Sequence, residues 1–148
     1  MSSKQVECIF CEAAASRDDE RSLVVFRGKR VFVLLNRYPY TNGHVMVAPV
    51  AHEAWFSDSA PETLTELIAT VARAEAILVA EYRTDGLNVG VNFGSAAGAG
   101  IASHYHVHVV PRWAGDTNFM TVAGGVRVVP EQLDVTRRRL TALFAGGA

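Results

Sequence analysis

Short apolar runs separated by turn residues fill the first third of the chain. Residues 23–26 and 31–35 are β-rich runs, and the segment between them contains Gly28, which predicts a hairpin with glycine in the turn. A loop follows over residues 36–43, and residues 44–48 form a third apolar run that stops at a proline. We therefore expect three short strands before the middle of the chain.

A helical period replaces this pattern from Ser59 onward. The tetrapeptide Ser59-Ala60-Pro61-Glu62 has the form of a capping box, and proline is tolerated in a first helical turn. Apolar residues then recur at helical spacing, at positions 64, 67, 68, 71, 77 and 78. We expect this helix to end near Gly86, since glycine suits a C-terminal turn.

The second half of the chain returns to strands and ends in a helix. Residues 87–93 predict a fourth strand, and a Gly/Ala-rich loop follows over residues 94–100. Pro130 opens a final helix, whose expected core contacts are Leu133, Leu140, Leu143 and Phe144. Four or five short strands with one long helix indicate an α+β fold with an antiparallel sheet.

Three of the five histidines alternate with apolar residues in the run His104-Tyr105-His106-Val107-His108. Successive side chains of a strand point to opposite faces, so the three imidazoles share one face at intervals of about 7 Å. Such a row is difficult to explain as packing. It is compatible with metal ligation, and equally with a nucleophile or general acid–base, because an imidazole offers both protonation states near neutral pH.

Composition narrows the classes of function. The 148 residues suit one domain, with 49% hydrophobic and 20% charged residues. A net charge of −1 argues against a generic binder of nucleic acid or membrane surfaces, and we interpret Arg137-Arg138-Arg139 as a solvated helical turn. No apolar run is long enough to span a membrane, and residues 1–7 lack the apolar stretch of a signal peptide, so we expect a cytoplasmic protein.

The two cysteines are spaced as C-x-x-C at Cys8 and Cys11. This spacing is typical of half a zinc site or of a redox pair, although no strand precedes Cys8 as a thioredoxin-like motif requires. A closed zinc site needs two more nitrogen or sulfur ligands. The candidates are His52 and one histidine of the triplet.

These motifs together resemble the histidine triad (HIT) superfamily. The segment from His104 to Val110 looks like its defining signature, histidine-apolar-histidine-apolar-histidine-apolar-apolar. The segments 36–49 and 86–92 resemble the blocks that precede the signature. Residues 115–120 resemble the bacterial diadenosine tetraphosphate hydrolase/phosphorylase-like branch.

The resemblance implies one HIT domain over residues 1–148. Its fold would be a five-stranded antiparallel sheet with one long and one C-terminal helix, and the sheet would continue across a homodimer. Residues 1–20 would be a zinc-binding segment, and residues 130–148 the C-terminal helix and tail. The implied structural zinc would be held by Cys8, Cys11, His52 and His104.

The implied activity is cleavage of dinucleoside polyphosphates through a nucleotidyl-histidine intermediate on His106. His108 would contact the phosphate or the leaving group, and His44 would support them. The implied substrate-binding residues are Asn36 at the ribose, Asn92, the loop residues Ala99, Gly100 and Ile101, and His108, with Phe10 and Val33 beside the base.

One departure from the family pattern lies at Gly100, where many hydrolases carry glutamine or serine. A roomier loop could accept inorganic phosphate instead of water, which would make the protein a diadenosine tetraphosphate phosphorylase. Nucleoside phosphoramidates are another possible substrate. An interpretation of a different class is a nucleotide-binding protein without turnover, and nothing in the residues selects the base.

Overall fold

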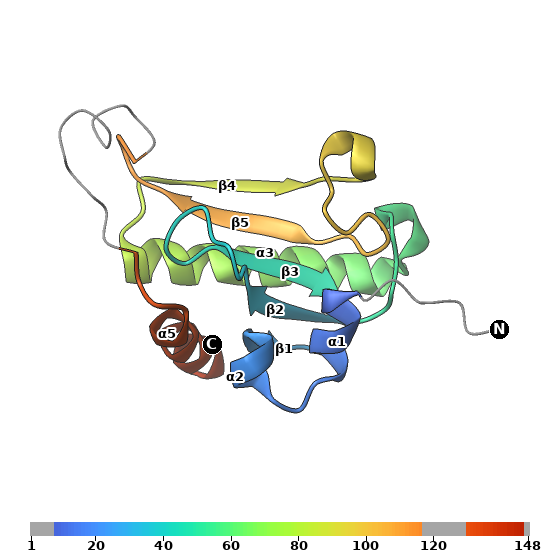
Figure 1. The fold of residues 1–148 in the computed structure, drawn as a ribbon, viewed down its shortest axis with the longest axis horizontal. Coiled ribbons are helices and arrows are strands. Elements are labelled where there is room, and N and C mark those ends of the chain that lie inside the picture. Colours follow the sequence, from blue (N-terminus) through green and yellow to red (C-terminus); the bar gives the residue numbers. More distant parts are fainter. Residues whose placement is uncertain (1–7, 117–129, 147–148) are drawn as a thin grey trace.

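The computed structural model describes residues 8–116 and 130–146, which form a five-stranded sheet with helices on both faces (Figure 1). The strands are β1 (Val24–Arg27), β2 (Val31–Leu35), β3 (Val45–Pro49), β4 (Gly86–Val91) and β5 (Val107–Arg112). They are ordered β1-β2-β3-β5-β4, and every neighbouring pair is antiparallel. The expected sheet and the hairpin around Gly28 are confirmed.

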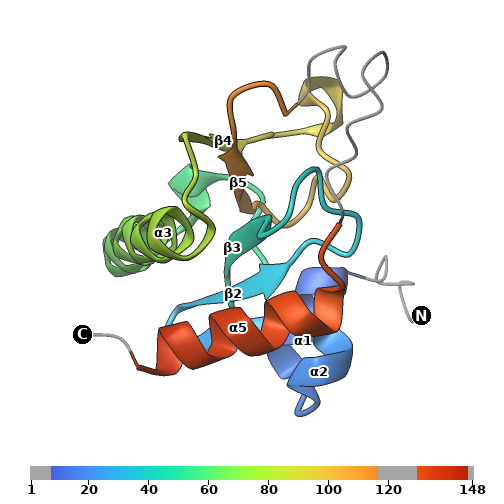
Figure 2. The same ribbon diagram turned by 90° about the vertical axis from the view of Figure 1, so that its left-hand side faces the viewer.

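The helices lie on opposite sides of this sheet. The long helix α3 (Pro61–Tyr82) covers one face, and the short helices α1 (Ile9–Ala15) and α2 (Asp19–Ser22) lie on the other side (Figure 2). The C-terminal helix α5 (Leu133–Ala145) packs against β1. The described part of the chain also has two 3₁₀ turns, η1 (Phe56–Asp58) and η2 (Ser95–Ala97). No helix among the described residues has the length and apolar character needed to cross a membrane.

Strand β2 shows how alternation places the core. Val31, Val33 and Leu35 belong to the large apolar cluster with α3, whereas Phe32 and Leu34 belong to a second cluster with α1. Both faces of β2 are thus buried, which its unbroken apolar sequence suits. The expectation that Val33 lies beside a bound base is wrong, because its side chain points to the α3 face.

The expected start and end of the long helix are also corrected. Ser59 does not cap it: its hydroxyl lies 2.6 Å from the Tyr105 hydroxyl, and Ala60 occupies the N-cap position. The helix ends at Arg83, which adopts the left-handed conformation with φ 49°, while Gly86 opens β4. The local sequence does not reveal that Ser59 finds a hydroxyl partner just before β5. Nor does it reveal that a residue other than glycine adopts the left-handed conformation at the end of the helix.

The C-terminal helix begins at Leu133 rather than Pro130, and its expected contacts Leu140 and Phe144 are buried. The arginine cluster is only partly the solvated turn that we expected. Arg139 donates to Glu81 of α3 at 2.7 Å and also pairs with Glu131, so it fastens α5 to α3. Arg138 remains exposed beside Asp134.

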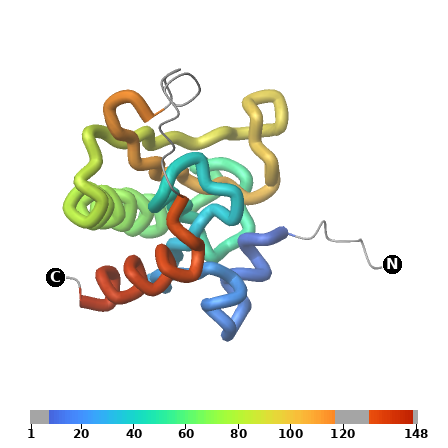
Figure 3. Tube along the Cα trace, turned by 60° about the vertical axis from the view of Figure 1, so that its left-hand side comes forward, coloured from blue at the N-terminus to red at the C-terminus, as the bar shows by residue number. Residues whose placement is uncertain are grey.

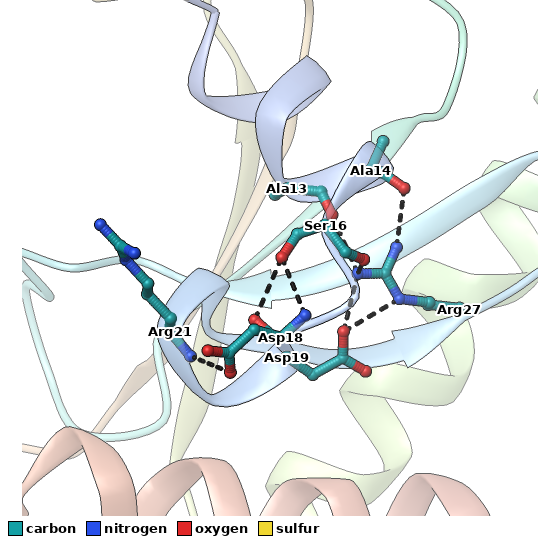
Figure 4. A network of polar contacts seen from close by, with 7 residues as sticks. All are labelled: Ala13, Ala14, Ser16, Asp18, Asp19, Arg21 and Arg27. Atoms are coloured by element: carbon teal, nitrogen blue, oxygen red, sulfur yellow. Dashed lines mark hydrogen bonds and ion pairs between the residues drawn. The ribbon is translucent and has the colours of Figure 1, made fainter.

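Arg27 fixes the segment that carries the two cysteines (Figure 4). Its guanidinium donates to the carbonyl oxygens of Ala13, Ala14 and Ser16 at 2.9 Å each, and to the Asp19 carboxylate at 2.7 Å. These carbonyls lie at the C-terminal end of α1, where a helix leaves acceptors without a full set of intrahelical partners, and the Ala13 carbonyl also accepts from the Ser16 N–H. One side chain of β1 therefore holds the end of α1 against the sheet.

Candidate active site and metal centre

The three histidines of the signature share one face, as the alternation predicts. Tyr105, Val107 and Val109 enter the large cluster with α3, while His104 and His106 pack against Phe10 of α1 on the other side. Strand β5 begins only at Val107, so His104 and His106 lie in the segment just before it. His104 and His106 are buried, and His108 is half-buried.

His106 has its tautomer and its ring plane fixed by neighbours. Its Nδ1 lies 3.1 Å from the carbonyl oxygen of His104, so Nδ1–H donates and Nε2 keeps its lone pair. The Phe10 ring stacks on it at 4.4 Å and 26°. Burial lowers the pKa of His106, opposed by the hydrogen bond to His104. A neutral, aimed imidazole nitrogen is the form that acts as a nucleophile.

A hydrogen-bonded chain leads from the backbone through His44 to His108. The Tyr40 N–H donates to His44 Nδ1 at 3.2 Å, which leaves the proton of His44 on Nε2. His44 Nε2 lies 2.9 Å from His108 Nδ1 and donates to it, so His108 carries its own proton on Nε2. His108 therefore presents a donor beside the His106 ring, whose centroid is 4.9 Å away.

Burial lowers the pKa of His44 to about 4, with smaller contributions from His108 and His106. Between pH 4 and pH 6.5, His44 is therefore mostly protonated in the unfolded chain, where its pKa is near 6.5, and mostly neutral in the folded protein. We expect the free energy of unfolding to decrease by roughly 1 kcal/mol per pH unit from this group as pH falls through that window. Urea titrations at pH 7, 6 and 5 with saturating zinc measure it.

The matched variant is His44→Asn, which cannot titrate in this range. Its absolute stability should be lower, because two hydrogen bonds are lost, but the slope of unfolding free energy against pH should be shallower than in the wild type. Equal slopes in the two proteins would contradict the assignment of a strongly depressed pKa to His44.

A cavity of about 920 Å³ opens over these histidines. It is lined by the expected residues His106, His108, Asn36, Asn92, Gly100 and Ile101. Ala99 is not part of the lining, although its neighbours on either side are. The sequence did not identify two apolar residues of the cavity lining, Leu34 on β2 and Met46 on β3. Alternation along those strands would have indicated them once Val33 was assigned to the opposite face.

The four expected zinc ligands come together behind this site. One ligand atom from each of Cys8, Cys11, His52 and His104 lies within 4.8 Å of all the others. His104 Nε2–H donates to the Pro49 carbonyl at 2.8 Å, so Nδ1 is free to bind a cation. That Nδ1 lies 3.2 Å from His52 Nδ1 and 3.4 Å from Cys8 Sγ, and Cys11 Sγ lies 3.2 Å from His52 Nδ1.

These distances fit a tetrahedral zinc ion. Usual zinc bond lengths place two ligand nitrogens about 3.3 Å apart and a nitrogen and a sulfur about 3.6 Å apart. The Cys₂His₂ donor set is typical of structural zinc and leaves no open position for substrate. The residues therefore fit the expected metal, and they would hold it between α1 and the segment that carries His106.

Comparison with known proteins agrees with this geometry. A family model for the HIT domain matches residues 17–115. An AP-4-A phosphorylase of Mycobacterium tuberculosis is 46% identical over 127 residues, which make up 86% of this chain and 65% of that protein. A HIT-like protein of Saccharolobus solfataricus is 30% identical over 113 residues, 76% of this chain and 79% of its own length.

A solved structure shares the whole architecture. The crystal structure of a Zn-bound histidine triad family protein from Mycobacterium smegmatis matches with a TM-score of 0.75 and 26% identity, covering 95% of this chain and 94% of that one. This chain and that one thus share the antiparallel sheet with its helices. This chain belongs to the HIT family. It spans 65% of the length of its phosphorylase relative.

Proposed function

We propose that this protein cleaves dinucleoside polyphosphates of the diadenosine tetraphosphate type by nucleotidyl transfer through His106. The observation that carries the proposal is the pair of fixed tautomers, with a lone pair on His106 Nε2 and a proton on His108 Nε2 in one cavity. A non-catalytic nucleotide-binding protein has no need of a nucleophile and a proton donor aimed into the same space.

In the first step His106 Nε2 attacks the α-phosphorus, and the bond from that phosphorus to the bridging oxygen breaks. The leaving nucleoside triphosphate takes the electron pair, and His108 Nε2–H donates to its oxygen. As the new bond forms, the His106 ring becomes cationic, and its Nδ1–H bond to the His104 carbonyl strengthens. Placing the charge beside a fixed carbonyl dipole stabilises the transition state more than the neutral ground state.

In the second step an acceptor oxygen attacks the phosphorus of the nucleotidyl-histidine and releases His106. Water as acceptor gives AMP, and inorganic phosphate gives ADP. The AP-4-A phosphorylase relative supports phosphate as the acceptor. The loop supports it too: no described atom lies within 4 Å of a Cβ built on Gly100, so the position beside the cavity is open.

Product analysis on diadenosine tetraphosphate tests the acceptor. With millimolar inorganic phosphate we expect ADP and ATP, and without it we expect at most slow formation of AMP and ATP. Gly100→Gln places a polar side chain at this open position, where its Cβ would have no neighbour within 4 Å. We expect this variant to lower the ratio of ADP to AMP at least about tenfold, because it occupies the space that phosphate would use and orients water.

Gly90→Ala provides a matched control, since a Cβ there also meets nothing within 4 Å and Gly90 is not part of the cavity lining. Its product ratio should equal that of the wild type. AMP and ATP as the main products in excess phosphate would overturn the phosphorylase assignment and establish a hydrolase. Turnover of an adenosine phosphoramidate but not of the dinucleotide would overturn the substrate class.

The zinc ion and the dimer are parts of the same proposal. A zinc ion held by the Cys₂His₂ set would be structural, since all four of its positions are taken by protein. Among the residues that the structure describes, strand β4 is an edge strand that pairs with β5 alone, and Val89 on it is half-exposed. Pairing of two such edges in a homodimer would cover unpaired backbone groups.

A further inference from the structure

Two tyrosines of the loop between β2 and β3 are almost fully exposed. Tyr38 is 83% exposed and Tyr40 is 80% exposed, although both line the cavity that contains His106 and His108. A large aromatic side chain left in water forfeits the burial that usually stabilises it. Exposed aromatic rings at the rim of a substrate cavity therefore suggest a binding surface.

The backbone that carries these rings is held firmly. The Tyr38 N–H donates to Asn36 Oδ1 at 2.9 Å, and the Tyr40 N–H donates to His44 Nδ1 at 3.2 Å. Further along, the Thr41 hydroxyl donates to the Pro111 carbonyl at 2.7 Å, and Asn42 Oδ1 accepts from the Glu131 N–H at 2.8 Å. The exposed rings thus sit on a pre-ordered loop, which lowers the entropic cost of binding to them.

The end of this loop is equally constrained. Gly43 has φ +81°, and a Cβ built there would lie 3.2 Å from both Leu78 and Tyr82. Only glycine meets both requirements.

Apart from this end, Figures 2 and 3 show the loop, drawn in teal, on the side of the sheet away from α3, where α1 also lies.

An unbroken row of rings joins Tyr40 to the nucleophile. The Tyr40 ring stacks on His44 at 5.3 Å and 13°, the His44 and His108 rings are 5.1 Å apart, and His106 follows at 4.9 Å. His108 is the proton donor to the leaving group in the proposed first step. Tyr40 therefore lies beyond the leaving-group side of His106, in the direction the polyphosphate chain must extend. Tyr38, two residues earlier in the same loop, lines the same cavity.

We propose that Tyr38 and Tyr40 form a stacking surface for the second nucleoside, the one that departs with the leaving group. This inference rests on the proposed function. Stacking on an aromatic face stabilises any base, so the surface selects substrates with two nucleosides over those with one without selecting the base. The cavity volume of about 920 Å³ lies near the upper end of ligand sites, which suits a dinucleotide.

The test compares two substrates that give the same nucleotidyl-histidine. Diadenosine tetraphosphate and adenosine 5′-tetraphosphate share the adenosine and α-phosphorus attacked by His106, but only the former carries a second nucleoside. The measured quantity is the ratio of their kcat/KM values, dinucleotide over mononucleotide. We expect Tyr38→Ala to lower this ratio about tenfold and Tyr38→Phe, which keeps the ring, to retain it.

Trp55→Ala is the matched control, because Trp55 is a half-exposed aromatic residue outside the cavity lining. Its substrate ratio should equal the wild-type ratio. The inference is overturned if Tyr38→Ala and Tyr40→Ala leave the ratio unchanged, or if Tyr38→Phe lowers it as far as Tyr38→Ala, which would assign the effect to the hydroxyl. Failure of the wild type to turn over either substrate would instead overturn the proposed function.

Discussion

Replacing His106 with alanine is expected to lower kcat/KM for diadenosine tetraphosphate by at least about 10⁴-fold, equivalent to roughly 5.5 kcal/mol of transition-state stabilisation. The reason is geometric: His106 Nε2 is the unprotonated nitrogen that the His104 carbonyl and the stacked Phe10 ring aim into the cavity. Steady-state kinetics measures the loss. Intact-protein mass spectrometry of the quenched wild type should show one added nucleotidyl group, which the variant lacks.

His108→Ala separates the role of the nucleophile, His106, from that of the proton donor, His108. Without a donor to the leaving oxygen we expect a loss of about 10²- to 10⁴-fold for diadenosine tetraphosphate. The loss should shrink markedly for a nucleotide ester with an aryl leaving group that departs without a proton. His106→Ala should be equally inactive on both substrates. Retention of activity within tenfold of wild type by His106→Ala, or an adduct on another residue, would contradict the mechanism.

The sequence was sufficient for the elements whose signals are local. Alternation around His106 predicted which side chains share a face, and the structure places Tyr105 and Val107 in the opposite core. The four zinc ligands, separated by up to 96 residues, were predicted through the family resemblance, and their ligand atoms meet within 4.8 Å. Spacing alone left the partners of the C-x-x-C pair open, because it cannot say which distant histidine returns to it.

The features that escaped prediction depend on tertiary partners. Ser59 has the sequence of a helix cap, but a buried tyrosine hydroxyl offers it a partner that the local pattern does not reveal. Arg139 was interpreted as part of a solvated helical turn, yet it pairs with the carboxylate of Glu81 on α3 and with that of Glu131 just before α5. The tautomers of His44 and His108 are set by a backbone N–H of the preceding loop. No pattern of residue types records such a contact.

Loss of the metal is expected to lower the melting temperature by about 10 °C or more, since a structural zinc site contributes several kcal/mol and each accounts for about 2–4 °C in a chain of this size. Cys8→Ser removes one ligand from a buried position while changing the side-chain volume little. Calorimetry should show the decrease, and metal analysis should show loss of zinc. Glu12→Gln, an exposed change on the same helix, is the matched control.

Cys8→Ser should also lose activity, because the metal site and the nucleophile His106 share one segment of the chain. His104 would hold the metal with its ring, and its carbonyl orients His106. Phe10 lies between the two cysteines in the sequence, stacks on the His106 ring and makes a tilted contact with the His104 ring. Freeing this segment removes both constraints on the nucleophile. Adding zinc to chelated wild-type protein should restore melting temperature and turnover together. A chelated protein that lost turnover but kept its melting temperature would assign the metal to catalysis and contradict the structural role.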